Sequence, residues 1–331
     1  MNKVLHRDYF NFLAIDHKSV SWILLVGAVL MSSCRTIKDP GIRDALYNST
    51  CNQRNLYSYT ADQLPVALHQ QQLSKRLTEK FDHNTLNMAN AIGILDLMDK
   101  YMQLRTRGDS TSMDARVRML ELKQDIDHRI NAASIEISAV SSEMDCEEER
   151  VSQVANYLKG RQGDRESKLT KGAIVVGALG AILAGGAIKN EGVSNTIGIT
   201  AGIGEAGLGL MMLFNKESVE FYHKRNALKD VWDNVETSAI FPPLVWYYLK
   251  YKNPSIGQDK SLREQIVEKW TNLGQINLDP KKSSAPLFFG EGGKYSTDEL
   301  ENRADMYDQL ESSITLMKQD LKALMLALDK I

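Results

Sequence analysis

The segment from Gly202 to Gly207 is the part of this chain that comes closest to a motif with known chemistry. It matches the G-x-G-x-x-G pattern of dinucleotide-binding loops. Such a loop works between a strand and a helix, because the helix N-terminus must face the pyrophosphate. The flanking residues here are small and apolar, without alternating strand and helix patterns. We therefore expect no dinucleotide site.

The histidines and acidic residues show no spacing typical of a metal site or an acid–base pair. No two histidines lie four residues apart, and none lies at zinc-ligand spacing from a cysteine. The acidic run Glu147-Glu148-Glu149 is interpreted as a solvated helix face. We expect no metal, no cofactor and no enzymatic activity, although residues distant in sequence can still assemble a catalytic site. The histidines are His6, His17, His69, His83, His128 and His223.

The composition favours long helices and a partner other than nucleic acid. Aromatic residues make up 7% of the 331 residues, and there are only 7 prolines. The formal net charge is −2, and no stripe of Lys and Arg is interleaved with aromatic residues. We therefore expect an all-α protein that does not bind nucleic acid.

An apolar run at residues 19–31 leads directly into Ser32, Ser33 and Cys34. The run is shorter than the roughly 20 residues that a membrane-spanning helix needs, but it has the length of a signal-peptide core. The sequence Leu30-Met31-Ser32-Ser33-Cys34 resembles a bacterial lipobox. The resemblance implies that residues 1–33 are a signal peptide and that Cys34 carries lipid at the bacterial outer membrane. An ordinary cleaved signal, an uncleaved anchor and a cytosolic chain are the alternatives.

Heptad patterns predict a helical hairpin over residues 62–171, after a polar tether at 34–61. Apolar residues recur at three- and four-residue steps through 77–102 and again through 119–158. A turn is expected at Gly108-Asp109-Ser110. An ordinary bundle of core helices fits this pattern as well as an extended stalk does.

Cys51 and Cys146 are the two cysteines that remain if Cys34 carries lipid. An antiparallel hairpin of residues 62–106 and 114–158 places the start of one arm beside the end of the other. We therefore expect a disulfide between them in an oxidising compartment, with two free thiols as the alternative.

The C-terminal region, 215–331, is also expected to be helical. A helix over 216–252 is interrupted at Pro242-Pro243, and a short helix follows near 260–272. Ser296 and Glu299 form a capping-box pattern ahead of a heptad that continues to the C-terminus. That seam needs a partner, either the first hairpin or another copy of the chain. No strand-rich region is expected.

Residues 172–214 hold 11 of the 22 glycines and read as an apolar helical hairpin. Small residues four apart create a groove along a helix that lets another helix approach closely. Glu205 is a charge inside the second arm, where it can be protonated, face an interface or pair with Lys171. The expected helix-packing residues are Gly177, Ala181, Gly185, Gly198, Gly202 and Ala206.

This hairpin resembles the glycine-zipper hairpins of bacterial outer-membrane lipoproteins, such as the surface-exclusion lipoproteins of conjugative plasmids. The resemblance covers only the lipobox and residues 172–214. It implies that lipid and hairpin together anchor the protein, often in a ring of identical subunits. A buried oligomeric core and a hairpin that inserts on a signal are the alternatives.

The predicted protein is therefore all-α, with long coiled-coil-like helices around a central glycine-rich apolar hairpin. We expect an envelope lipoprotein that oligomerises and scaffolds, or forms part of, a trans-envelope assembly of the secretion or conjugation type. Its partners are membrane lipid, identical subunits and other envelope proteins. One alternative is an α-helical pore-forming protein whose hairpin inserts on oligomerisation. Another is a periplasmic enzyme or binding module with no visible motif.

Overall fold

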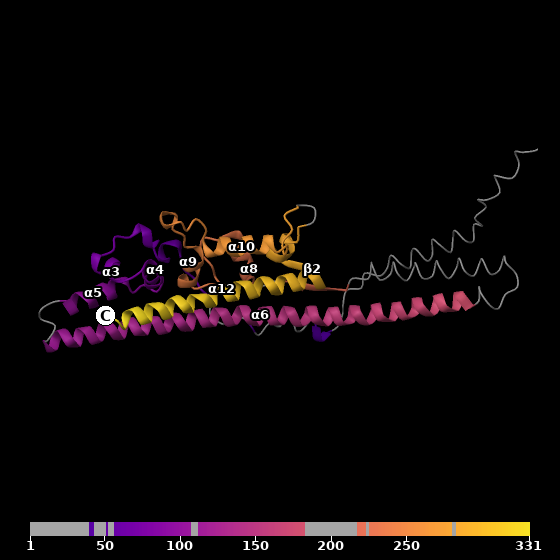
Figure 1. Ribbon diagram of the computed structural model, residues 1–331, viewed down its shortest axis with the longest axis horizontal. Helices are drawn as coiled ribbons and strands as arrows, with labels where there is room; N and C mark the ends of the chain where they lie inside the picture. The colour runs from indigo at the N-terminus through magenta and orange to yellow at the C-terminus, as the bar shows by residue number, and fades with distance from the viewer. Residues whose placement is uncertain are drawn as a thin grey trace, which may run out of the picture. The chain divides into compact units, whose positions relative to one another are not determined.

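The computed structural model describes residues 40–42, 51, 56–106, 112–182, 217–222, 225–279 and 283–331. This part of the chain is mostly helical with little strand, as the all-α class requires (Figure 1). The chain divides into two compact units. The larger unit comprises residues 39–155 and 220–331, and the smaller comprises residues 1–38 and 156–219.

Two long helices form the spine of the larger unit. Helix α6 (Met113–Ile182) begins in this unit, and helix α12 (Thr297–Leu328) lies alongside it (Figure 1). The hydroxyl oxygens of Ser141 and Thr315 lie 2.7 Å apart across the pair. The predicted heptad residues of both helices are buried where the helices pack. On α6 these include Ile126, Ile130, Ala133, Ile137, Val140 and Met144; on α12 they include Leu300, Tyr307, Leu310, Ile314, Met317, Leu321 and Leu324.

The ends of these helices are fixed by local sequence. The capping box predicted at the start of α12 is confirmed: the hydroxyl of Ser296 accepts from the Glu299 amide, and the Glu299 carboxylate accepts from the Ser296 amide. At the start of α6, the Ser112 hydroxyl accepts from the Ala115 amide. These bonds satisfy amide groups that a helix leaves unpaired in its first turn.

The first arm of the predicted hairpin is not one continuous helix. Residues 61–106 form the short 3-10 helices η1 (Ala61–Gln63) and η2 (Leu68–Gln70), then α3 (Lys75–Lys80), α4 (His83–Ala91) and α5 (Leu95–Thr106). Asp82 restarts the helix as an N-cap, accepting from the Thr85 amide at 2.9 Å. Gly93 breaks it again with φ at +70°. The prediction of a single arm over 62–106 is therefore wrong.

Helix α6 also departs from the predicted boundaries. It runs without interruption to Ile182, ten residues beyond the expected start of the glycine-rich hairpin at Gly172. The described residues of the smaller unit are 156–182 of α6 and 217–219. Within this unit the Arg165 guanidinium donates to the Glu217 carboxylate at 2.7 Å.

The region predicted as one helix over 216–252 contains a strand. Strand β1 (Ser218–Tyr222) pairs with β2 (Gly292–Ser296) to form a two-stranded sheet. A side chain at Gly292 would lie 2.3 Å from the Phe221 carbonyl oxygen, so the close pairing requires glycine there. The remaining elements are α8 (Ala227–Asp233), α9 (Pro243–Lys250), η4 (Pro254–Ile256), α10 (Leu262–Asn272) and α11 (Ala285–Phe289).

Aromatic rings fill the space between these short C-terminal elements. Trp232 stacks on Phe289 with ring centroids 4.5 Å apart, and Trp246 stacks on Phe241 at 5.4 Å. Buried aromatic pairs contribute stability beyond their buried area. The short helices thus have a core of their own while they pack on α12.

The cap of α10 makes a testable contribution to stability. Glu264 accepts from the Ser261 amide at 2.7 Å and from Lys252 at 3.0 Å, and these bonds lower its pKa from 4.5 to about 2. The stabilisation is therefore present above pH 4.5 and is lost as the pH falls toward 2. We expect Glu264→Ala to lower the free energy of unfolding by about 0.5–2 kcal/mol at pH 7 and by less at pH 3. Urea unfolding at both pH values measures this, and Glu264→Gln, which keeps the capping geometry without the charge, is the control.

Candidate functional site

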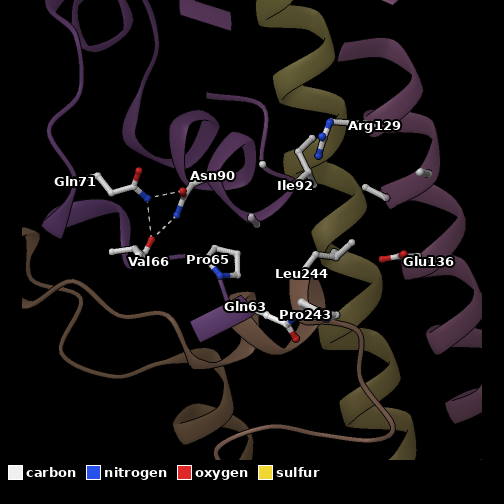
Figure 2. Close-up of a pocket in the computed structure, with 14 residues that line it drawn as sticks. Gln63, Pro65, Val66, Gln71, Asn90, Ile92, Arg129, Glu136, Pro243 and Leu244 are labelled. Carbon is white, nitrogen blue, oxygen red and sulfur yellow. Dashed lines mark hydrogen bonds between the residues drawn. The ribbon is translucent and has the colours of Figure 1, made fainter. Parts of the chain in front are cut away.

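A cleft of about 670 Å³ lies in the larger unit (Figure 2). It is formed by residues 63–71, the end of α4, α6 and the start of α9. Four segments distant in sequence therefore contribute to one surface. The polar lining residues are Gln63, Gln71, Asn90, Arg129 and Glu136. The larger apolar lining residues are Pro65, Val66, Ile92, Pro243 and Leu244.

One wall of the cleft is held by the buried hydroxyl of Tyr247. This oxygen accepts from the Asn90 side chain at 2.8 Å and from the Leu68 amide at 3.3 Å, and it donates to Asn87 at 2.8 Å. Burial raises the pKa of Tyr247 to about 12, so the hydroxyl stays protonated at neutral pH. The phenol thus joins η2, α4 and α9.

Amide side chains extend this wall toward the solvent. The Asn90 amide donates to the Val66 carbonyl at 2.8 Å, and Gln71 donates to the same carbonyl at 2.9 Å (Figure 2). Gln71 also donates to the Asn90 oxygen at 2.6 Å. The network fixes both side chains, so this side of the cleft is preorganised.

Helix α6 supplies the charged groups of the cleft. Arg129 and Glu136 are seven residues apart, which places them about two turns or 10 Å apart along one side of the helix (Figure 2). Burial raises the pKa of Glu136 above its ordinary value. A cation, a carboxylate, amides and apolar side chains together suit a peptide-like ligand, which carries both polar and apolar groups.

Two histidines meet at one tyrosine, which the sequence did not indicate. The ring centroids of His69 and His83 each lie 6.0 Å from that of Tyr251, and the Tyr251 hydroxyl lies 3.1 Å from Nε2 of His83. Burial lowers the pKa of His83. Among the described residues, no group of three or more His, Cys, Asp or Glu side chains is placed to hold a metal ion.

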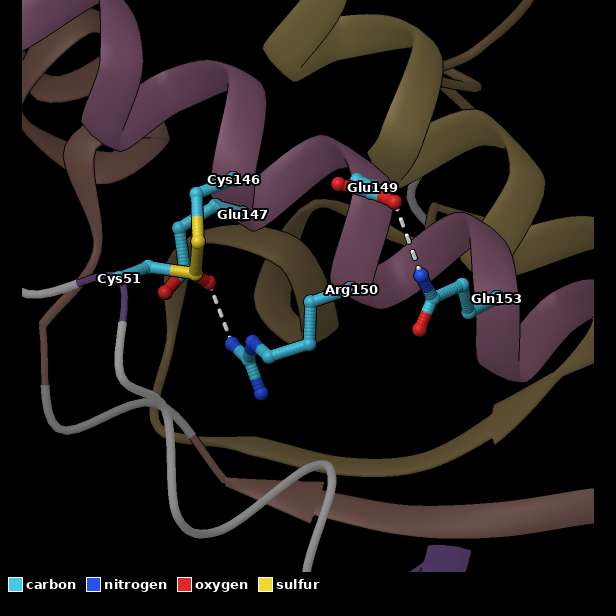
Figure 3. Close-up of a disulfide and its surroundings, with 6 residues drawn as sticks. All are labelled: Cys51, Cys146, Glu147, Glu149, Arg150 and Gln153. Atoms are coloured by element: carbon cyan, nitrogen blue, oxygen red, sulfur yellow. Dashed lines mark hydrogen bonds and ion pairs between the residues drawn. A yellow bond between two sulfur atoms is a disulfide. The ribbon is translucent and has the colours of Figure 1, made fainter.

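The structure joins Cys51 and Cys146 in a disulfide, with Cα atoms 5.5 Å apart (Figure 3). The geometry differs from the one expected, because Cys146 lies in the middle of α6 rather than near the end of a hairpin arm.

Part of the expected tether is also bound to the core. The Tyr57 amide donates to the Ala239 carbonyl at 3.2 Å, and the Tyr59 hydroxyl donates to the Phe241 carbonyl at 3.1 Å.

The acidic run beside Cys146 is not a uniformly solvated helix face, so that interpretation is wrong for one of its residues. Glu147 is buried and pairs with Arg150, because it lies on the same side of α6 as Met144 and Val151. Glu149 is exposed and accepts from Gln153 at 3.0 Å (Figure 3).

Further buried charges surround this part of α6. Glu143 accepts from Arg225 at 2.6 Å. Arg303 is 1% exposed and donates to the Phe288 carbonyl at 3.0 Å and to Asn226 and Tyr307 at 3.3 Å. These bonds compensate much of the cost of burying the charges. The cluster therefore connects α6, the residues around β1, and α12.

Most residues predicted to act at the membrane lie outside the described residues. These are Cys34, Gly185, Gly198, Gly202, Glu205 and Ala206. Gly177 and Ala181 lie in the last turns of α6. None of the described helices is both long enough and apolar enough to cross a membrane. Lipidation, hairpin insertion and helix packing by these residues stay predictions.

Comparisons with protein-family models, with curated proteins and with solved structures give no match for this chain. The resemblance to glycine-zipper lipoproteins therefore rests on the sequence alone.

The hydroxyl of Tyr247 can be tested by Tyr247→Phe. This change removes the bonds that Tyr247 makes with the Leu68 amide, Asn87 and Asn90, so we expect the free energy of unfolding to fall by about 1–3 kcal/mol. Chemical denaturation measures the change. Tyr222→Phe is a matched control because Tyr222 is 49% exposed. Equal stability of the two variants would contradict the role given to Tyr247.

The disulfide can be tested with the double variant Cys51→Ala/Cys146→Ala. The bridge closes a loop with a sequence separation of 95 residues, so we expect its loss to lower the free energy of unfolding by about 2–5 kcal/mol. Urea unfolding of the variant is compared with unfolding of the wild type under reducing conditions. The two should agree, and a variant as stable as the oxidised wild type would contradict the prediction.

Proposed function

We propose that this protein is a lipid-anchored protein of the bacterial envelope that self-associates and scaffolds a trans-envelope assembly, of the secretion or conjugation type. The disulfide between Cys51 and Cys146 is the observation that carries the proposal. Structural disulfides form and persist in oxidising compartments, including the bacterial periplasm. Cys51 is only 17 residues after Cys34, the predicted lipid site, so the bridge connects the start of the mature chain to the core.

The long helices support a mechanical role rather than a chemical one. Helix α6 has 70 residues, which correspond to about 105 Å at 1.5 Å per residue. Helices of such length suit proteins that span a distance or assemble side by side. The glycine-rich residues after α6 supply the second membrane contact in this proposal, and other envelope proteins are the partners.

The cleft beside Tyr247 favours a binding role within the same proposal. Its wall is fixed by hydrogen bonds, and its lining combines apolar side chains with one cation and one carboxylate. A segment of an envelope partner is the kind of ligand that this lining suits. The cleft thus gives the scaffold a place to hold a second protein.

Lipidation is tested by expressing wild type and Cys34→Ala in bacteria with a labelled fatty acid. We expect label on the wild type only, and release of the mature N-terminus at residue 34 only in the wild type, because acylation precedes cleavage. The double variant Cys51→Ala/Cys146→Ala is the control, since it retains Cys34 and should keep the label. Identical label and size for wild type and Cys34→Ala would exclude the lipid anchor.

Membrane insertion is tested in the same cells by an alkaline carbonate wash of the membranes. Because Cys34→Ala keeps residues 1–33, it is compared with the same variant lacking residues 183–214. If Cys34→Ala remains in the washed membranes and the deletion variant is released, the glycine-rich residues supply an anchor of their own. If Cys34→Ala is fully released, or if the deletion variant remains as well, the inserted hairpin must be abandoned.

A further inference from the structure

The larger unit carries a patch of carboxylates where α6 and α12 lie together. None of them forms an ion pair with a Lys or Arg of the described chain. The pKa of Glu148 is raised by burial and then by the negative charges of the other four residues. The acidic patch consists of Asp145, Glu148 and Glu149 of α6 and Asp305 and Asp308 of α12.

A cleft with the opposite charge lies at the other end of this pair of helices. It has a volume of about 510 Å³ and is lined by α5 and the first turns of α6. Three of its six lining residues are exposed cations, and none of the six is acidic. The basic cleft consists of Tyr101, Arg105, Arg116, Met119, Leu120 and Lys123.

The basic cleft keeps a net positive charge although acidic residues lie near it. Arg118 and Asp114 pair with each other at 3.4 Å on an adjacent side of α6. A smaller hollow next to the cleft shares Lys123 with it and also includes Asp127 and Asp329, so Arg105 and Arg116 carry most of the net positive charge of the basic cleft. Among the described residues, Arg105 and Arg116 have no ion-pair partner. Leu120 is 69% exposed at the same place, so a partner would also cover apolar surface.

The acidic patch and the basic cleft cannot meet within one molecule. Lys123 and Glu148 are 25 residues apart on one continuous helix, which is about 37 Å. The Debye length is only about 8–10 Å at physiological ionic strength. The same 25 residues make about seven full turns, so both side chains lie on the same side of α6. A second molecule can therefore contact both regions at once.

We propose that two copies of the chain associate with their α6 helices antiparallel, so that the basic cleft of each copy binds the acidic patch of the other. The two-fold axis lies at Ser134, which is midway between Lys123 and Asp145 and also midway between Leu120 and Glu148. Ser134 lies two turns from Ser141 on the side of α6 that borders α12, so each copy presents both long helices at the axis. A two-fold arrangement satisfies both pairs of charged regions and closes the assembly.

This interface deepens the self-association within the proposed function by giving it a surface. It is independent of the lipid, because all its residues lie in the larger unit. A monomeric protein that carries lipid would exclude this interface and leave the anchor intact. A dimer that carries no lipid would support this interface and exclude the lipid anchor.

Charge reversal tests the interface on the purified full-length chain in detergent, by sedimentation equilibrium. The first variant is Arg105→Glu/Arg116→Glu/Lys123→Glu, and the second is Asp145→Lys/Glu149→Lys/Asp305→Lys. All six positions are exposed, so circular dichroism should be unchanged. We expect each variant alone to dimerise at least about tenfold more weakly than the wild type, because both contacts become repulsive. An equimolar mixture should regain dimers, because the two changes are complementary.

Controls separate this interface from a general effect of charge. Lys229→Glu/Lys269→Glu/Lys294→Glu changes three exposed lysines elsewhere and should dimerise as the wild type does. Wild-type dimers should weaken as salt is raised from 50 mM to 500 mM. The proposal fails if the control is weakened as much as the first variant, or if the mixture stays monomeric.

Cross-linking tests the two-fold geometry. Ser134→Cys and the control Lys229→Cys are each combined with Cys34→Ala, so that the introduced cysteine is the free thiol while Cys51 and Cys146 are held in their disulfide. A short bis-maleimide should then give a covalent dimer, and Lys229→Cys should not. Association without a Ser134→Cys cross-link would overturn the antiparallel arrangement.

Discussion

The fold depends on the apolar seam between α6 and α12. Ile137, Val140 and Met144 on α6 and Leu310 and Ile314 on α12 are each at most 1% exposed. Burial of such side chains contributes about 1.5–3 kcal/mol each. Helices α4 and α10 and strand β2 all pack against α12, so they too are positioned by this seam. The cleft beside Tyr247 lies next to this seam, where Arg129 and Glu136 of α6 line it.

Buried charge gives the seam its specificity. Apolar heptads allow several alignments of two helices, but Glu143 of α6 must meet Arg225 while Arg303 of α12 reaches the next residue, Asn226. A shift of one turn would leave these charges buried without partners, at a cost of several kcal/mol. The same cluster lies beside Cys146, where the disulfide fixes the N-terminal segment. Packing, charge and covalent linkage therefore select the same arrangement.

A rigid pair of long helices suits the scaffold that we propose, because a scaffold must keep its contact surfaces at fixed distances. Helix α6 holds Arg129 and Glu136 at the cleft, and it separates Lys123 from Glu148 by about 37 Å. In the proposed dimer, such spacing would make charge complementarity selective, because only one alignment of two molecules satisfies both charged regions.

The sequence by itself determined the features that depend on neighbours a few residues away. The heptad and the Ser296–Glu299 capping box specified α12, and the pattern through 119–158 specified most of the packed face of α6. The predicted oxidising compartment and the predicted hairpin suggested the pairing of Cys51 with Cys146, which the structure contains in a different geometry. Short-range periodicity carries this information because a helix repeats every 3.6 residues.

Only the tertiary structure decided the features built from distant segments. The arm at 62–106 breaks at Asp82 and Gly93 because the short helices pack on α12 and α9. Strand β1 forms because β2 supplies its hydrogen-bonding partner more than 60 residues later, and Glu147 turns inward because Arg150 can pair with it in the core. The cleft joins four such segments. No local pattern records these contacts, because each depends on where the rest of the chain is held.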